Sequence, residues 1–285
     1  MTTTSTITLP SGTVEYASYG PDKSAHPPIV FMHGVAVDHR LWQPVAEILA
    51  ARGYRSYAPT MPLGSHHIPW GPSADRSPRG AARLLREFVD RLGLADATLV
   101  ANDTGGAITQ YALDADPHFV RALVFTNCDA FDLFPPQPFQ LVFALLRQRL
   151  LLKPLIETMR WRALRHSSLG VGLLVTDPDP DLTRSVFEPL RTDARIRDDL
   201  IAFLHEIDPA DLAAVTPRMS RVQVPVAMVW GTGDRCFTPE HGRRFADVFG
   251  DAQFIEVPHA RTFVSLDQPQ AVADGVVAAS ARSDR

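Results

Sequence analysis

The stretch LVANDTGGAITQ, residues 99–110, passes from an apolar run into a helical pattern through a turn of small residues. It places one carboxylate, Asp103, at the turn, between the small residues Ala101 and Gly105. Asp103 could cap the following helix, because a carboxylate there accepts hydrogen bonds from free backbone N–H groups and favours the helix dipole. Asp103 could instead be a nucleophile. The rest of the chain has to distinguish these two interpretations.

Short apolar runs alternate with amphipathic stretches on both sides of this turn, which is typical of a mainly parallel sheet flanked by helices. The runs predict strands at 28–34, 97–103, 121–128, 225–231 and 253–258. The amphipathic stretches predict helices at 39–51, 78–92, 105–115, 238–248 and 269–281, and residues 7–20 resemble an antiparallel hairpin. Between Cys128 and Pro225 the alternation gives way to Leu- and Arg-rich segments broken by prolines. We therefore expect an α/β core from residues 1–128 and 225–285, with a helical cap at 129–224.

Composition limits the partners. The chain has 45% hydrophobic and 21% charged residues, and its net charge of −4 is spread along the sequence. No basic face for nucleic acid or anionic lipid is expected, and no apolar run reaches the roughly 18 residues that span a bilayer. The spacing of Cys128 and Cys236 suits neither a zinc site nor a disulfide framework, which predicts reduced, buried thiols and a cytoplasmic protein. We expect a small-molecule substrate and neither a metal nor a cofactor.

The chain resembles the α/β-hydrolase fold with a helical cap, over nearly its full length. Three motifs carry the resemblance: His33-Gly34 after an early strand, the elbow Ala101–Gly105, and GTGD at 231–234 after a late strand. The elbow pattern needs small residues on both sides of the nucleophile, because bulky ones would collide with the backbone in a strained turn. Asp103 stands at the nucleophile position, as in the aspartate branch of this family.

An aspartate nucleophile suits attack on an sp³ carbon, because its carboxylate is already ionised at neutral pH and needs no activating base. The attack forms an alkyl ester that water must then hydrolyse. The resemblance implies that the backbone N–H groups of Thr104 and Val35 form the oxyanion hole for that second step.

The resemblance also implies an orienting acid and a base. Asp234 stands where the family's acid usually follows a strand, although it could instead cap the helix near residue 238. Asp129 and Asp132 are a second location for the acid. The family's histidine position falls on Thr262 in VPHARTFVSLDQP, residues 257–269, and His259 lies three residues earlier. A shifted loop could bring His259 to Asp103 as an atypical base; otherwise His259 is an exposed loop residue.

Four more side chains, with Thr262, are candidates for the substrate pocket. His33 either supports its own turn or faces the pocket. His66, in the loop MPLGSHHIPWG at 61–71, could bind a polar substrate group. Phe131 and Trp161 could give an apolar lining, and packing of the cap on the sheet would use the same residue types.

The auxiliary residues of three familiar aspartate chemistries are missing. Haloalkane dehalogenases usually place a tryptophan after the nucleophile, where this chain has Thr104, and fluoroacetate dehalogenases place arginines there. Epoxide hydrolases use tyrosines of the cap, and the predicted cap contains none. Hydrolysis of a carbon–heteroatom bond through Asp103 therefore stands first, without a named substrate. The alternatives are a lyase, isomerase or cyclase that uses Asp103 as acid or base, and a non-catalytic ligand-binding protein.

Overall fold

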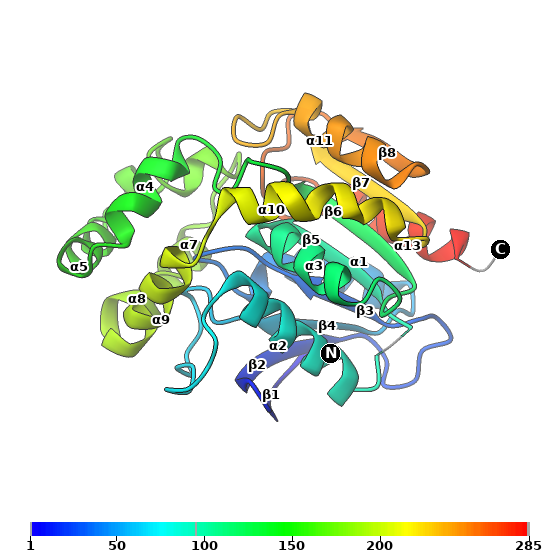
Figure 1. The fold of residues 1–285 in the computed structure, drawn as a ribbon, viewed down its shortest axis with the longest axis horizontal. Coiled ribbons are helices and arrows are strands. Elements are labelled where there is room, and N and C mark those ends of the chain that lie inside the picture. Colours follow the sequence, from blue (N-terminus) through cyan, green and yellow to red (C-terminus); the bar gives the residue numbers. More distant parts are fainter. Residues whose placement is uncertain (1, 95, 284–285) are drawn as a thin grey trace.

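The computed structural model describes residues 2–94 and 96–283 (Figure 1). Its centre is a sheet in the order β1-β2-β4-β3-β5-β6-β7-β8, in which β1, β2 and β4 pair antiparallel and all later pairs are parallel. The strands are β1 (Thr2–Leu9), β2 (Gly12–Tyr19), β3 (Ile29–Met32), β4 (Ser56–Thr60), β5 (Thr98–Asp103), β6 (Ala122–Cys128), β7 (Val226–Gly231) and β8 (Ala252–Val257).

The predicted fold class is confirmed. Strands β3, β6 and β7 are buried along their whole length, which explains why their apolar runs stand out in the sequence. Strand β4 was not predicted, because its sequence SYAPT has no continuous apolar run and contains Pro59. Pro59 is tolerated there because β4 accepts partners on both sides over only part of its length.

Helices cover both faces of the sheet. The helices α1 (Gln43–Ala51) and α13 (Pro269–Arg282) pack together on one face. The other face carries α2 (Pro78–Arg91) and α3 (Thr104–Ala115), with α11 (Pro239–Ala246) beside β7 and β8. Shorter turns are η1 (His39–Trp42), η4 (Asp247–Phe249) and α12 (Val264–Asp267). The helix expected at 39–51 is thus a 3₁₀ turn followed by α1, which begins next to Pro44.

The segment predicted as the cap is helical. It contains α4 (Phe139–Leu146), α5 (Arg149–Thr158), α6 (Arg162–Arg165), η2 (Val171–Leu173), α7 (Pro180–Ser185), α8 (Glu188–Thr192), α9 (Ala194–His205), α10 (Pro209–Val215) and η3 (Thr216–Arg221). In Figure 1 the helices α4, α5, α7, α8 and α9 lie together at the left, beside the sheet. The last two elements, α10 and η3, pack against α3 instead. Helices α4 to α9 are therefore the part of this segment that stands apart from the helices of the sheet.

Candidate active site

Asp103 occupies a sharp turn between β5 and α3. Its φ of 53° and ψ of −133° are a conformation that an L-residue adopts only under strain. The turn packs tightly against the neighbouring backbone: a Cβ added at Gly105 would lie 2.6 Å from the carbonyl oxygen of Met32, and one at Gly34 would collide with the Asp103 carboxylate. The small residues in the elbow and the Gly of the His33-Gly34 motif are therefore required by the geometry.

Two backbone N–H groups point at the Asp103 carboxylate. They belong to Thr104 and Val35, and their hydrogen bonds lower the pKa of Asp103. Burial acts in the opposite direction and is the largest effect, and the nearby charge of Asp234 adds to it. The net result raises the pKa of Asp103 from 3.8 to about 7. The N–H pair expected from the sequence therefore lies against this carboxylate.

Asp103 faces a cavity of about 240 Å³ between the sheet and the cap. Val35 and Thr104 line it beside Asp103, and α4, α5, residues 169–174 and Phe187 cover it. Asp103 is the single ionisable side chain among the described residues that line this cavity, and the rest of the lining is almost entirely apolar. Such a cavity accepts a small, neutral and largely apolar molecule.

Asp234, at the end of β7, is buried and well bonded. One of its oxygens accepts a hydrogen bond of 2.7 Å from the backbone N–H of Cys236, and the other accepts one of 2.9 Å from the hydroxyl of Thr262. Burial raises the pKa of Asp234 to about 6, although these hydrogen bonds oppose the shift. The structure therefore joins Asp234 and Thr262, two residues 28 positions apart that the sequence analysis singled out separately.

A third acid, Asp129, lies beside Asp103. It directly follows β6, whose last residue Cys128 pairs with Asp103 in the sheet, and its backbone N–H donates to the Asp103 carbonyl oxygen at 3.4 Å. Asp129 is fully buried and neither carboxylate oxygen has a hydrogen-bond partner. Burial, and then the charge of Asp103, raise the pKa of Asp129 well above its usual value. The hydroxyl of Thr104 approaches the carboxyl and favours its ionised form without completing a hydrogen bond of good geometry.

The structure leaves His259 outside this cluster. His259 is exposed on the turn after β8 with a φ of 65°, and it does not line the cavity. A left-handed residue in a tight turn has its backbone fixed, so the loop shift that would carry the side chain inward is not present. No histidine lines the cavity among the residues that the structure describes.

Of the two roles considered for His33, the structure shows support of its own turn, and His33 is not part of the cavity wall. Its Nε2 accepts a hydrogen bond of 2.8 Å from the backbone N–H of Met61, so Nδ1 carries the proton and donates to the carbonyl oxygen of Gly34 at 2.8 Å. Burial lowers the pKa of His33 to about 4. His33 is therefore neutral and holds Gly34 next to Asp103.

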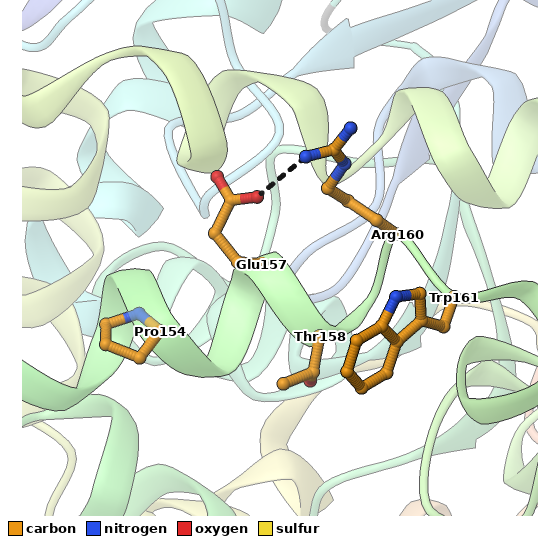
Figure 2. Close-up of a pocket in the computed structure, with 5 residues that line it drawn as sticks. All are labelled: Pro154, Glu157, Thr158, Arg160 and Trp161. Atoms are coloured by element: carbon orange, nitrogen blue, oxygen red, sulfur yellow. Dashed lines mark ion pairs between the residues drawn. The ribbon is translucent and has the colours of Figure 1, made fainter.

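Trp161 and Phe131 also lie elsewhere than predicted. Trp161 is 69% exposed and borders a separate surface pocket with Pro154, Glu157, Thr158 and Arg160 (Figure 2). Phe131 packs edge-on against Phe245 and lies beneath the guanidinium of Arg244, outside the cavity. The apolar lining comes instead from Phe139, Phe143 and the other cap residues.

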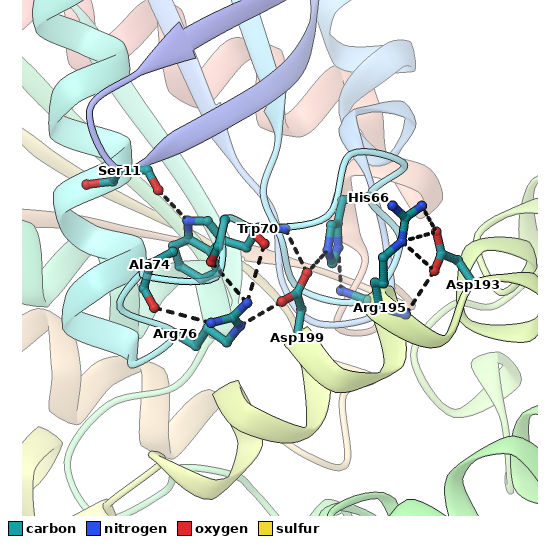
Figure 3. Close-up of polar contacts among 10 residues, drawn as sticks. Ser11, His66, Trp70, Ala74, Arg76, Asp193, Arg195 and Asp199 are labelled. Atoms are coloured by element: carbon teal, nitrogen blue, oxygen red, sulfur yellow. Dashed lines mark hydrogen bonds and ion pairs between the residues drawn. The ribbon is translucent and has the colours of Figure 1, made fainter.

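His66 is also absent from the cavity wall. It is buried, and its Nδ1 accepts from the backbone N–H of Gly64 while its Nε2 donates to Asp199 of α9 at 3.3 Å (Figure 3). Asp199 accepts further hydrogen bonds from Arg76 at 2.7 Å and from the N–H of Trp70 at 2.8 Å. His66 therefore fastens the loop at 61–71 to the cap and has no site for a substrate group.

The other predictions concern metals and thiols. No group of three or more potential metal ligands occurs within residues 2–94 and 96–283. Cys128 and Cys236 are buried and free, as predicted. Within the same ranges no helix has both the length and the apolar character needed to cross a membrane.

Comparison with known proteins identifies related chains. Residues 29–275 match the alpha/beta hydrolase family. Haloalkane dehalogenase 2 of Mycobacterium tuberculosis is 25% identical over 273 residues, which cover 90% of this chain and 88% of that protein. The 2-hydroxy-6-oxononadienedioate/2-hydroxy-6-oxononatrienedioate hydrolase of Escherichia coli K12 is 29% identical over 168 residues, 57% of this chain and 54% of that protein.

The fold has a similar neighbour among solved structures. The crystal structure of the haloalkane dehalogenase DbeA from Bradyrhizobium elkani matches 100% of this chain and 99% of its own, with a TM-score of 0.80 at 19% identity. The family match includes all of the parallel strands and the elbow that presents Asp103, and it makes this protein a hydrolase-like enzyme. The chain belongs to the alpha/beta hydrolase family.

Proposed function

We propose that this enzyme hydrolyses a carbon–heteroatom bond of a small, neutral, largely apolar molecule, with Asp103 as the nucleophile. One observation carries the proposal: Asp103 is the single ionisable side chain among the described residues of the cavity wall, and the N–H groups of Thr104 and Val35 point at its carboxylate. Full-length similarity to haloalkane dehalogenase 2, a protein named for cleavage of such a bond, supports it.

In the first step a free oxygen of ionised Asp103 attacks the sp³ carbon of the substrate. A carbon–oxygen bond forms, the carbon–heteroatom bond breaks, and the leaving group departs with its electron pair. The other carboxylate oxygen stays with the N–H groups of Thr104 and Val35. The ester carbonyl therefore already occupies the hole that stabilises negative charge in the next step.

In the second step water attacks the ester, and a base must take its proton. His259 is exposed, and Thr262 holds the oxygen of Asp234 that a triad histidine would otherwise occupy. We assign the base to Asp129, with the Thr104 hydroxyl, which lines the cavity, passing the proton.

The assignment of Asp129 as the base depends on how the charge of Asp103 changes during the reaction. Burial, and then the charge of ionised Asp103, raise the pKa of Asp129, so that Asp129 holds a proton before the reaction. Esterification makes Asp103 neutral and removes the second of these effects, which makes the ionised form of Asp129 less unfavourable, while burial remains. As the carbon–heteroatom bond breaks in the first step, Asp129 gives its proton to the departing group through the Thr104 hydroxyl, and the resulting carboxylate later accepts a proton from the attacking water by the same route. The first step therefore produces the base that the second step needs.

A second candidate is proton transfer without hydrolysis, as in a lyase, isomerase or cyclase. It is favoured by the pKa of Asp103, which at about 7 suits a group that both gives and takes a proton at neutral pH. The bonding of Thr262 to Asp234 at the family's histidine position favours it too.

Trapping of the ester separates the two candidates. We expect reactive alkyl halides or epoxides to be turned over by the wild type and to leave no adduct on Asp103→Asn. The Asp129→Asn variant should accumulate an ester on Asp103, detected by intact mass and peptide mapping, while turnover falls by about 10²–10⁴-fold. Absence of any adduct from the wild type and from Asp129→Asn, across both reagent classes, would reject the nucleophile and leave proton transfer.

The variant Thr262→His supplies an independent check. If the protein lacks hydrolysis because the histidine is missing, this change should create hydrolytic turnover that the wild type does not have. The variant His259→Gln should leave turnover unchanged, because that side chain is exposed and outside the cavity.

A further inference from the structure

The exposed apolar side chains of this protein are gathered in one place. Among the described residues, every large hydrophobic side chain that is exposed lies between positions 141 and 169, in α4, α5 and the segment that follows. Leu150 is 89% exposed, Leu169 is 80% exposed and Trp161 is 69% exposed. We call this region the cap patch. An apolar surface of this kind marks a site of interaction, because scattered single residues would need no explanation but a cluster does.

The same stretch is basic, although the chain as a whole is acidic. Residues 139–170 contain six Lys and Arg and one Glu, a net charge of +5, against −4 for the entire chain. Arg165 is buried and bonds to backbone carbonyl oxygens, and Arg149 pairs with Asp198. Lys153 and Arg162 are exposed, and no ion pair to either occurs within the described residues. The average composition of the whole chain conceals this local positive charge.

The cap patch adjoins the cavity that holds Asp103. Leu145 and Leu169 are both exposed and part of the cavity lining. Thr158 borders this cavity and also the surface pocket beside Trp161 shown in Figure 2. A molecule that enters through these residues therefore crosses the apolar, basic surface first.

We propose that the cap patch binds an anionic lipid surface and opens the cavity toward the lipid phase. Exposed Leu and Trp side chains flanked by Lys and Arg are the composition of segments that lie in a membrane interface. Anionic headgroups attract the basic side chains, and the acyl region takes up the apolar ones. The neutral, apolar substrate assigned under the proposed function partitions into the same phase, and the inference of substrate entry rests on that assignment. Binding itself does not depend on chemistry at Asp103.

A second copy of this chain is the competing occupant. Two cap patches placed face to face would bring Lys153 and Arg162 of both copies together, and the one acid within the patch, Glu157, already pairs with Arg160 and Arg191. An anionic surface is complementary in charge to the cap patch. A second cap patch is not.

The test uses Trp161 as a reporter, since Trp42, Trp70 and Trp230 are buried. Phosphatidylcholine vesicles that contain phosphatidylglycerol should shift the wild-type tryptophan emission to shorter wavelength and should pellet the protein. Vesicles of phosphatidylcholine alone should do so more weakly, and added salt should reduce binding to the anionic vesicles.

Variants locate the contact. Leu150→Glu and the double change Lys153→Glu with Arg162→Glu should each weaken binding to anionic vesicles by about tenfold or more. The matched double change Lys23→Glu with Arg91→Glu, which alters the net charge equally at exposed positions outside the cap patch, should bind like the wild type.

Three results would overturn the proposal. The first is no emission shift and no pelleting of the wild type with either vesicle. The second is equal binding by the double change in the cap patch and by the matched double change Lys23→Glu with Arg91→Glu. The third is a dimer that buries Trp161 without vesicles, measured by sedimentation, which would assign the patch to a second copy. None of these results depends on catalysis, so the proposal can fail while Asp103 still reacts.

Discussion

Buried carboxyl groups in this protein differ in their partners: Asp199 is bonded to a cation, and within the described residues the acids next to the cavity are not. Asp199, between the cap and the loop at 61–71, accepts hydrogen bonds from Arg76, His66 and the N–H of Trp70. Figure 3 shows these contacts. Burial alone would raise the pKa of Asp199, but these partners outweigh it and lower the pKa. Asp199 is thus an ionised group with a structural role.

The acids next to the cavity, Asp103 and Asp129, have no such charged partners in the described structure. Burial raises the pKa values of Asp103 and Asp129, and neither carboxyl is paired with a cation in the described structure. An unpaired buried carboxylate destabilises a fold and persists where function requires it. The comparison indicates that the acid with a structural role is paired here, and that the acids to which we assign chemistry are unpaired beside the cavity.

The largest loss of stability should come from removing the charge of Asp199. Asp199→Asn removes the charge that compensates Arg76, whose side chain is 23% exposed, and we expect a loss of about 3–5 kcal/mol in the free energy of unfolding at pH 7. Because the pKa of Asp199 is lowered by folding, its contribution is present above 3.8 and is lost as pH falls through the folded value. Urea unfolding at several pH values measures this.

The neighbouring acid supplies the control for Asp199. Asp198 forms an exposed ion pair with Arg149, and Asp198→Asn should change stability by about 1 kcal/mol or less. Equal effects from the two changes would show that the buried network around Asp199 does not hold the cap to the loop.

A smaller effect of opposite sign is expected from Asp129→Asn. The folded pKa of Asp129 lies above its unfolded value, so the wild type loses stability as pH rises toward the folded value, and Asn avoids that loss. We expect Asp129→Asn to be more stable than the wild type at pH 8, and to be so by a smaller margin at pH 5. The exposed Asp132→Asn should change stability by about 1 kcal/mol or less. A destabilised Asp129→Asn at pH 8 would mean that this carboxylate has a partner in solution.

The smallest effect concerns the hydrogen bond between Thr262 and Asp234. Thr262→Val removes the donor at 2.9 Å and should cost about 1–2 kcal/mol at pH 8, where Asp234 is ionised. Thr262→Ser keeps the hydroxyl and serves as the control. If Val and Ser behave alike in thermal unfolding at pH 8, the hydroxyl does not support the charge of Asp234.

Sequence reasoning succeeded where local constraints are strong. Strands buried on both faces need continuous apolar runs, so β3, β5, β6 and β7 were predicted close to their observed bounds. The elbow at Asp103 could be predicted because its small neighbours are required by a strained turn. Strand β4 lacked such a signal, and its place depends on pairing with β2 and β3.

The rest of the site depends on contacts between distant residues. His66 is held by Asp199, 133 positions away, so its burial in a structural network has no local signal. Trp161 was a candidate for the cavity lining or for packing of the cap on the sheet, but its position between α5 and α6 leaves it exposed. The importance of Asp129 lies in its lack of a partner, and only the folded structure shows that. One signal was available: Asp129 follows a strand adjacent to the elbow strand, where side chains at the carboxyl ends converge.

The most direct test of the contrast between paired and unpaired acids is the pKa of Asp103 itself. Protein labelled with ¹³C at the aspartate side-chain carboxyl can be titrated by NMR, with the Asp103 and Asp199 signals assigned from their loss in Asp103→Asn and Asp199→Asn. We predict that Asp103 titrates with a midpoint near pH 7, because burial and the charge of Asp234 outweigh its two N–H donors, and that Asp199 stays ionised down to below pH 3.8. A midpoint for Asp103 at or below 3.8 would contradict the account, since Asp103 would then be as well compensated as Asp199.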